Sequence, residues 1–380
     1  MKIAVVGGGP AGMYFSLLLK KHDASHDITV YEQSPADATY GWGVVFSDVA
    51  LSFLKEADAE FYKKFTASHE RCDYMEVVHK DVHVQLRNNY FSRVSRIDLL
   101  KVLQDECKSV GVNFKFNTQV DDIGLLESAD LIVGADGANS GVRTRLAEHF
   151  KPHFEKRRNK FAWYGTRQLF HPVSLIFRET EYGVFIAHSY QYSKDLSTFL
   201  VEVDPDTWKR AGLDTMSDED SRRFCEQVFA KDLGSNGLLS NRSIWFSANI
   251  VSNENWSYKN VVLLGDALRT VHFSLGSGTR MAMQDAIALY EAVNLHGKDL
   301  PAAFAHFEKL RRTSSANFQT AAAKSLDWYE SVDQKMHLDP VIFAYDYMRR
   351  TGRVSHEDLK ERDPNFIARY EALTGMAEQG

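Results

Sequence analysis

The chain has 380 residues, 44% of them hydrophobic, which is enough for a large buried core and two or three domains and excludes a disordered chain. Its 45 basic and 51 acidic residues give a formal net charge of -6, which excludes a surface that binds nucleic acid nonspecifically. Three cysteines (Cys72, Cys107 and Cys225) provide neither a disulfide framework nor a paired-cysteine metal site. Without a signal-peptide pattern or a run of 18 apolar residues, we expect a cytoplasmic protein that does not enter a membrane.

The N-terminal segment predicts a strand, a helix and a second strand. Gly7, Gly9 and Gly12 form a G-x-G-x-x-G pattern between the first strand and the helix, and Glu32 ends the second strand. These glycines let a pyrophosphate approach the helix N-terminus, and the acid can accept hydrogen bonds from ribose hydroxyls. The pattern predicts a dinucleotide site, with an ordinary glycine-rich turn as the alternative. The expected elements are a strand at 2–6, a helix to about residue 21 and a strand at 27–32.

The pattern of hydrophobic residues changes twice along the remaining chain. Residues from about 161 to 203 alternate in the manner of an antiparallel sheet, and residues after 260 return to a buried strand followed by long helices. The region from about 161 to 203 is therefore expected to belong to a different domain, inserted into the N-terminal domain. The elements expected here are a helix at 95–110, strands at 112–123, 129–137, 173–179, 182–190, 197–203 and 260–266, and helices within 279–332.

Two of these later strands end in acidic residues. The segment LIVGADGANSGVR places Asp136 and Gly137 at a strand end, with Arg143 downstream, and LLGDALRTVHFSLGSG places Asp266 at another. FAD and NAD enzymes bind the adenosine half of the cofactor alike. Three strand ends that converge on one extended ligand favour FAD, although each pattern taken singly is more often an ordinary turn.

With these three motifs in this order, residues 1 to about 290 resemble the single-component (class A) FAD-dependent aromatic hydroxylases, typified by para-hydroxybenzoate hydroxylase. The resemblance implies an α/β fold: a Rossmann-like FAD-binding domain with an inserted antiparallel β-sheet substrate domain and C-terminal helices. The expected division is a discontinuous FAD-binding domain at 1–70, 94–155 and 256–330, a β-rich domain at 71–93 and 156–255, and a helical segment at 331–380.

The resemblance also implies the cofactor-binding residues. The loop after Asp266 turns beneath the flavin, and its helix N-terminus stabilises negative charge on the reduced ring. Arg96 corresponds to the family's flavin-contacting arginine, with a solvated helix residue as the alternative. The implied contacts are Gly7, Gly9, Gly12 and Glu32 with the ADP part, Asp136 and Gly137 near the pyrophosphate and the nicotinamide approach, Asp266 with the ribityl chain, and Gly276 and Gly278 close to the flavin.

A narrower group within the family shares further segments of this chain. HFSLGSGT, YGWGVVFSD, RNKFAWYGT and FIAHSYQYS resemble hydroxylases that act on salicylyl-CoA, 2-aminobenzoyl-CoA or tryptophan, and the C-terminal MHLDPVIFAYDYMRRTGR resembles the acyl-CoA members. The resemblance implies hydroxylation of salicylyl-CoA at position 5 to gentisyl-CoA with NADH (or NADPH) and O2, through a flavin C4a-hydroperoxide. Hydroxylation of 2-aminobenzoyl-CoA or tryptophan, and a noncatalytic flavin-binding protein, are the alternatives.

Three polar residues are candidates for catalysis. We expect His272 to hydrogen-bond or deprotonate the phenol, because imidazole titrates near neutral pH and the loop lies beside the flavin. Tyr164 and His188 lie in the β-rich domain, which covers the substrate in the family. Backbone capping by the histidine and ordinary packing of the strand residues are the alternatives. The residues expected to line the ring pocket are Trp42, Val44, Phe46 and Phe273.

Coenzyme A carries several phosphate charges, which need basic partners on an otherwise acidic protein. Three clusters could supply them, although a solvated basic face explains any single cluster equally well. The sequence does not choose among the clusters and does not indicate an oligomeric state. The candidates are Lys156, Arg157, Arg158 and Lys160; Arg311 and Arg312; and Arg349, Arg350 and Arg353, with Arg157 and Arg158 assigned to substrate binding.

Overall fold

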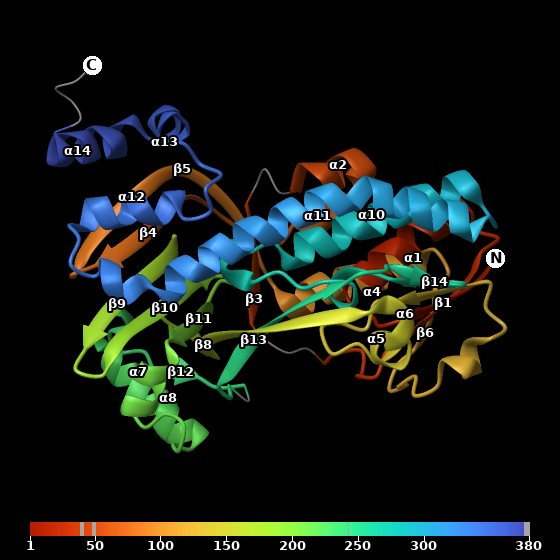
Figure 1. Cartoon of the computed structure of the whole chain (residues 1–380), viewed down its shortest axis with the longest axis horizontal. Helices are drawn as coiled ribbons and strands as arrows, with labels where there is room; N and C mark the ends of the chain where they lie inside the picture. Colours follow the sequence, from red (N-terminus) through yellow and green to blue (C-terminus); the bar gives the residue numbers. More distant parts are fainter. Residues whose placement is uncertain (39–41, 48–50, 242, 376–380) are drawn as a thin grey trace.

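The structure is a computed structural model, and it describes residues 1–38, 42–47, 51–241 and 243–375. Two sheets and a set of long helices make up these residues (Figure 1). None of the helices within the described ranges combines the length and the apolar character that crossing a membrane requires.

A six-stranded sheet forms the first half, in the order β14-β15-β7-β1-β2-β6. β1 pairs in parallel with β2 on one side and with β7 on the other, so the strand order reverses beside β1. Ligands of open α/β sheets bind at the carboxyl ends of the strands at such a reversal. The elements of this half are β1 (Lys2–Val6), α1 (Pro10–His22), β2 (Asp27–Tyr31), α2 (Ser52–Ala57), α3 (Ala59–Thr66), α4 (Arg96–Ser109), β6 (Asn113–Lys115), β7 (Leu131–Gly134), α5 (Gly141–Arg145), α6 (Ala147–Phe150), β14 (Ser257–Tyr258), β15 (Val261–Leu263) and α10 (Gly278–His296).

The second half is built on a nine-stranded sheet, in the order β12-β8-β11-β10-β9-β4-β5-β3, with β13 paired to β8. Its pairs are antiparallel except for β4 with β9. The elements are β3 (Gly43–Ser47), β4 (Glu70–His79), β5 (Val82–Ser95), β8 (Pro152–Thr166), β9 (Val173–Thr180), β10 (Gly183–Gln191), β11 (Ser197–Val203), α7 (Pro205–Arg210), α8 (Asp218–Val228), α9 (Ala230–Leu233), β12 (Leu238–Leu239) and β13 (Phe246–Asn253).

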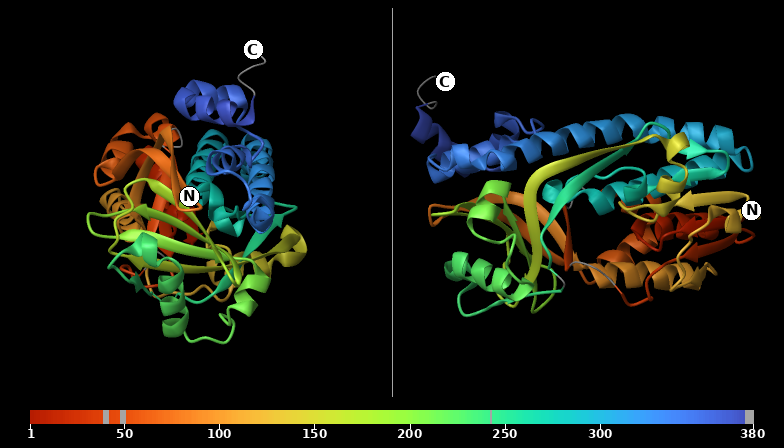
Figure 2. Two further views of the ribbon diagram at one scale, coloured as in Figure 1. Left: turned by 90° about the vertical axis from the view of Figure 1, so that its left-hand side faces the viewer. Right: turned by 60° about the horizontal axis from the view of Figure 1, so that its bottom comes forward.

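The strand pairing places two segments differently from the division expected from the sequence. β3 was expected in the FAD-binding domain, but it pairs with β5 and belongs to the second sheet. β8 begins at Pro152, within the range given to the first domain, because its early residues already pair with β13. Figure 2 shows the paired strands β8 and β13 curving between the halves, so the boundary crosses continuous strands.

Side chains of the nine-stranded sheet alternate between two buried clusters, as the period of two in a strand requires. On β9 and β10, Leu175 and Ile186 pack with the C-terminal helices, whereas Ile176 and Phe185 pack on the other face with residues around α8. The face on which a side chain lies therefore decides which of the two clusters it joins.

Four C-terminal helices complete the molecule. The 31-residue α11 runs from the helices of the first half to the second sheet (Figure 1), where Trp328 and Tyr329 join the buried cluster of that sheet. The helices are α11 (Leu300–Glu330), α12 (Pro340–Arg349), α13 (His356–Arg362) and α14 (Pro364–Thr374).

Candidate active site

A cavity of about 880 Å³ lies between the two halves of the molecule. Its wall combines Arg96 and Asp266 from the first half, His188 from the second sheet, and Tyr347 and Arg350 from the C-terminal segment. A cavity with contributions from all three parts is a natural place for a ligand that bridges them.

The glycine-rich loop fits a dinucleotide at the end of β1. Gly7 has φ +109°, and a Cβ on it would meet the carbonyl oxygen of Ala135 at 2.3 Å, so no larger residue fits there. A Cβ on Gly9 would meet nothing within 4 Å, and no side chain caps α1, which starts at the next residue. The loop is therefore tight against the protein and open toward the side from which a pyrophosphate would approach the helix N-terminus.

Glu32 lies against this loop. Its carboxylate accepts hydrogen bonds from the backbone N–H of Gly8 at 2.8 Å and of Ser34 at 2.7 Å. These bonds fix the carboxylate beside the glycines, where it could also accept a ribose hydroxyl.

The Asp136 carboxylate accepts hydrogen bonds from the Ser140 hydroxyl at 2.5 Å and the Val142 N–H at 3.1 Å, so it holds the start of α5. Next to it, the buried Arg143 donates to the carbonyl oxygens of Ala267 at 3.0 Å and Ala138 at 2.5 Å. Arg143 thus joins the loop after β7 to the loop after β15, a role that the sequence did not reveal. Gly137 lies in the first of these loops with φ +81° and open space around its Cα.

Arg96 and Asp266 both line the cavity. Enclosure by protein raises the pKa of Asp266, which the nearby Arg96 and Arg269 partly oppose, and burial lowers the pKa of Arg96. Gly276, with φ +58°, and Gly278 complete this side of the wall. Two opposite charges in the wall of this cavity suit recognition of the polar part of a cofactor.

His188 on β10 lines the cavity and is backed by a buried carboxylate. Its Nε2 lies 2.8 Å from Oε2 of Glu202 on β11, and Oε1 of Glu202 accepts a hydrogen bond from Nδ2 of Asn159 at 2.7 Å. The Glu202 side chain is 0% exposed. The bond assigns the proton to Nε2 and leaves Nδ1 as an acceptor, with no hydrogen-bond partner in the described part of the chain. This pair has the geometry of a general base and its orienting carboxylate.

His272 lies in the cavity wall with its ring 1% exposed. Its Nδ1 accepts the backbone N–H of Ser274 at 3.2 Å, which assigns the proton to Nε2, and Nε2 is buried without a partner. Burial, with Arg157 and His188 nearby, lowers the pKa of His272 to about 3. A neutral imidazole in this tautomer can donate a hydrogen bond but has no free lone pair for a proton. Of the two roles expected from the sequence, the geometry fits the hydrogen bond and not the deprotonation.

Three residues expected at the site lie outside the cavity wall. Tyr164 packs on the opposite face of the sheet, because the neighbouring residue Trp163 takes the cavity side of β8. Phe46 is fully buried against Phe65, with ring centroids 6.0 Å apart. Trp42 donates from its indole N–H to the Trp163 carbonyl oxygen at 3.2 Å and is not part of the wall.

Two other expected residues do reach the cavity. Val44 on β3 is part of its wall, and so is Phe273, whose ring centroid lies 4.6 Å from that of Phe161 and 6.2 Å from that of Trp163. The sequence missed Trp163 as a wall residue and Glu202 as the partner of His188. An acid within the apolar run STFLVEV was the available indication of Glu202, because a buried acid needs a partner.

The two arginines assigned to substrate binding lie on β8 next to the end of α11. Arg157 forms ion pairs with Glu155 at 2.7 Å, Asp327 at 2.6 Å and Glu330 at 2.9 Å. Arg158 is exposed, and its backbone N–H donates to Glu330 at 2.9 Å. Three carboxylates already neutralise Arg157, so its guanidinium is not free to bind a phosphate.

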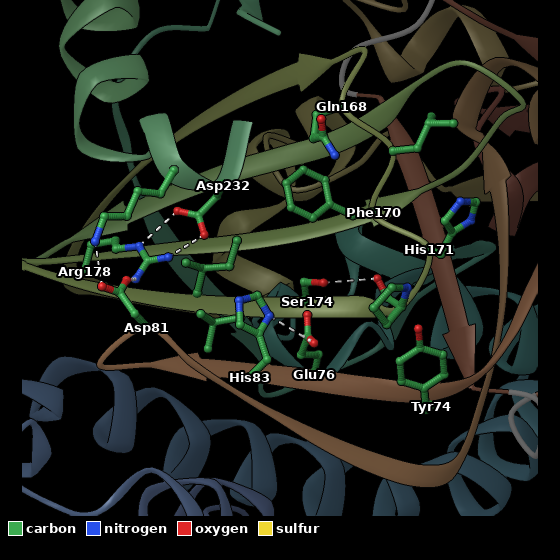
Figure 3. A pocket seen from close by; sticks show the side chains of 15 residues that line it. Tyr74, Glu76, Asp81, His83, Gln168, Phe170, His171, Ser174, Arg178 and Asp232 are labelled. Carbon is green, nitrogen blue, oxygen red and sulfur yellow. Dashed lines mark hydrogen bonds and ion pairs between the residues drawn. The ribbon is translucent and has the colours of Figure 1, made fainter. Parts of the chain in front are cut away.

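A second pocket, of about 500 Å³, lies on the opposite face of the nine-stranded sheet. On β4 it is lined by Glu76, whereas the neighbouring residue Met75 faces the main cavity. Figure 3 shows its charged side chains paired with one another: Glu76 with His83 at 3.1 Å, and Arg178 with both Asp81 and Asp232.

Comparisons with known proteins agree with this architecture. The family model described as "FAD binding domain" matches residues 127–312. The chain is 35% identical to the salicyloyl-CoA 5-hydroxylase of a Streptomyces species, over 98% of this chain and 73% of the relative. It is 34% identical to the protodeoxyviolaceinate monooxygenase of Chromobacterium violaceum, over 92% and 94% of the two chains.

A third relative, 32% identical over 94% of this chain and 97% of the other, is the 3-hydroxy-4-methyl-anthranilyl-[aryl-carrier protein] 5-monooxygenase of Streptosporangium sibiricum. Among solved structures, a tetrameric form of 2-methyl-3-hydroxypyridine-5-carboxylic acid oxygenase shares the fold, with a TM-score of 0.69 at 17% identity over 95% and 97% of the chains. The chain belongs to the family of FAD-dependent aromatic monooxygenases. FAD is its cofactor, and the glycine-rich loop, with its tight backbone and its open side, fits that assignment.

Proposed function

We propose that the protein hydroxylates the aromatic ring of salicylyl-CoA at position 5 and forms gentisyl-CoA. One salicylyl-CoA, O2, NADH and a proton give gentisyl-CoA, water and NAD⁺. The 35% identical relative named for this activity supports the substrate, and the family supports the reaction class. When bound, FAD accepts the hydride and supplies the activated oxygen atom.

The observation that carries the proposal is the histidine with its buried carboxylate in the cavity wall. His188 accepts the phenolic proton at Nδ1 while its Nε2–H stays on Glu202, which stabilises the imidazolium that forms. Loss of that proton increases electron density at the carbon para to the oxygen. In salicylyl-CoA this carbon is position 5.

Two further features of the wall support an aromatic substrate. The rings of Trp163 and Phe273 offer an apolar surface that can hold the substrate ring and exclude water. The neutral imidazole of His272 adds a polar group to the same wall.

Steady-state turnover with a panel of acceptors tests the proposal. The purified protein with FAD is supplied with NADH or NADPH and with salicylyl-CoA, free salicylate, 2-aminobenzoyl-CoA or L-tryptophan, and products are identified by mass spectrometry. We expect salicylyl-CoA to stimulate NADH oxidation and to gain one oxygen atom at position 5.

Two results would overturn the proposed substrate. Oxygenation of tryptophan or of 2-aminobenzoyl-CoA, without oxygenation of salicylyl-CoA, would show that the protein has the activity of a different member of the family. The aminobenzoyl thioester is included because the Streptosporangium relative is named for an anthranilyl thioester.

A further inference from the structure

The proposed thioester substrate carries phosphates at its nucleotide end, and these need basic side chains that carboxylates do not already neutralise. Arg269 and Arg311 both bind Asp285, at 2.7 and 2.8 Å. Arg312 pairs with Glu308. As with Arg157, carboxylates already balance the charges of Arg311 and Arg312.

Two arginines lie beside a single aromatic ring. The guanidinium carbons of Arg280, in the first turn of α10, and Arg353, after α12, lie 5.3 and 4.9 Å from the ring centroid of Phe318 on α11. Within the described ranges, neither has a carboxylate within ion-pair distance, 4.0 Å. The Nε of Arg280 is buried and has no hydrogen-bond partner in that part of the chain. Like charges gathered without counter-charges oppose folding, unless the ring and a bound anion stabilise them.

The electrostatics around Arg280 agree with this geometry. Burial, and then the charges of Arg353 and Arg311, lower the pKa of Arg280. A third cation lies nearby, because the ammonium of Lys324 is 3.0 Å from the position that a Cβ on Gly352 would take. Positive charge is therefore concentrated at this point of a chain whose net charge is -6.

Two acids share a surface recess of about 420 Å³ with Arg353, but both are engaged elsewhere. Asp346 binds Lys335 at 2.9 Å and the indole N–H of Trp328 at 2.7 Å. Asp358 accepts the hydroxyl of Ser355 at 2.8 Å as part of the cap of α13. Neither carboxylate neutralises Arg353.

Along the chain, the two arginines are next to residues that line the main cavity. Thr279 precedes Arg280 in the cavity wall, and Thr351 and Val354 flank Arg353 there. Arg350 lines the cavity itself and donates to the carbonyl oxygen of Ser274 at 3.3 Å. A ligand whose aromatic end lies beside His188 would extend along these wall residues to reach Arg280 and Arg353.

We propose that Arg280 and Arg353, stacked on Phe318 and assisted by Lys324, form the site that binds the phosphate groups at the nucleotide end of the coenzyme A thioester. The inference rests on the proposed function, because it assumes that the acyl group is carried by coenzyme A. Guanidinium groups bind phosphate oxygens with paired hydrogen bonds, and neighbouring guanidiniums can bind one phosphorylated ligand together.

Substrate truncation combined with charge removal tests the site. The variants are Arg353→Gln, Arg280→Gln and the double variant, with Arg369→Gln, an exposed arginine on α14, as the matched control. KM is measured for salicylyl-CoA and for the pantetheine thioester of salicylate, which lacks the nucleotide. Calorimetry measures the Kd of adenosine 3′,5′-bisphosphate, a readout that does not depend on turnover.

We expect the double variant to raise KM for salicylyl-CoA and Kd for the bisphosphate at least tenfold, while KM for the pantetheine thioester and the FAD content change less than twofold. The exposed Arg353→Gln alone gives part of this loss, so the test does not depend on the folding of Arg280→Gln. An equal rise in KM for both thioesters, or an unchanged KM for salicylyl-CoA, would overturn the proposed phosphate site.

The outcomes separate this inference from the proposed function. If the unaltered protein converts salicylyl-CoA and the variants bind it equally well, the phosphate site is wrong and the proposed function stands. If the unaltered protein converts an aryl-carrier-protein thioester but not the coenzyme A thioester, both proposals fail.

Discussion

The two cavities on opposite faces of the nine-stranded sheet differ in how their polar side chains are paired. In the pocket of Figure 3, Glu76, Arg178 and Asp232 find their partners within the pocket. In the main cavity, Glu202 binds Nε2 of His188 and Ser274 binds Nδ1 of His272. The other ring nitrogen of each histidine, Nδ1 of His188 and Nε2 of His272, has no partner among the described residues. A polar atom of a cavity wall that has no protein partner is available to pair with a bound ligand. Matched substitutions on the two faces test this difference.

The largest effect is expected from His188→Gln. Loss of the group that accepts the phenolic proton should lower kcat for hydroxylation on the order of 10³-fold, within the range for general acid–base catalysis. Single-turnover oxygenation measured by product mass, together with FAD content, checks this. His83→Gln, which removes an imidazole from the opposite face, is the matched control and should leave kcat within about twofold, since it lies outside the reaction cavity. Similar losses in both variants would contradict the assignment of the base.

A smaller decrease in kcat is expected from Glu202→Gln, which keeps the shape of the side chain but removes its charge. The imidazolium that forms at His188 then lacks its counter-charge, and kcat should fall on the order of 10²-fold. Because the carboxylate does not reach the cavity, KM for the pantetheine thioester should stay within about twofold. A change in KM with an unchanged kcat would mean that Glu202 shapes the pocket only.

His272→Asn should change how stability depends on pH. Asn can still cap Ser274 through its side-chain oxygen, but it does not titrate. The folded-state pKa of His272, about 3, lies below the unfolded value of 6.5, so protonation favours the unfolded chain as the pH falls from 6.5 toward 3. The unaltered protein should therefore lose about 2 kcal/mol more than the variant between pH 7 and pH 5. Urea unfolding at both pH values measures it, and parallel losses would refute the buried neutral imidazole.

The smallest effect is expected from Glu76→Gln, which breaks the ion pair with His83 in the pocket of Figure 3. The His83 side chain is 58% exposed, so the free energy of unfolding should fall by less than about 1 kcal/mol. Turnover should not change. A loss of turnover comparable with that of Glu202→Gln would show that the paired face also takes part in the reaction.

Local chemistry made much of the first half predictable. The strand at residues 2–6 is found as expected, because an apolar β-branched run next to a glycine turn has few alternatives. In the second half, the strand expected at 197–203 is found as well, and all its side chains are buried. The helix expected at 95–110 spans Arg96–Ser109.

The part that was not predictable depends on which face of a strand is covered. Trp163 and Tyr164 are neighbours with similar chemistry, and only the packing of α8 and the C-terminal helices decides which of them faces the cavity. The grouping of Arg280 with Arg353 likewise needs the helix packing around Phe318, which no local pattern contains. The Glu32 position and the glycine spacing, in contrast, follow from a single βαβ unit.

The contribution of α12 and the following loop to the cavity has a consequence for protein engineering. Tyr347, Met348 and Arg350 form part of the wall, and Arg350 also donates to Ser325 on α11 at 3.0 Å. The C-terminal segment therefore contributes to the cavity, although it lies far in sequence from the glycine-rich loop. Grafting this segment from one relative onto another offers a way to change the accepted acyl group while the cofactor half is left untouched.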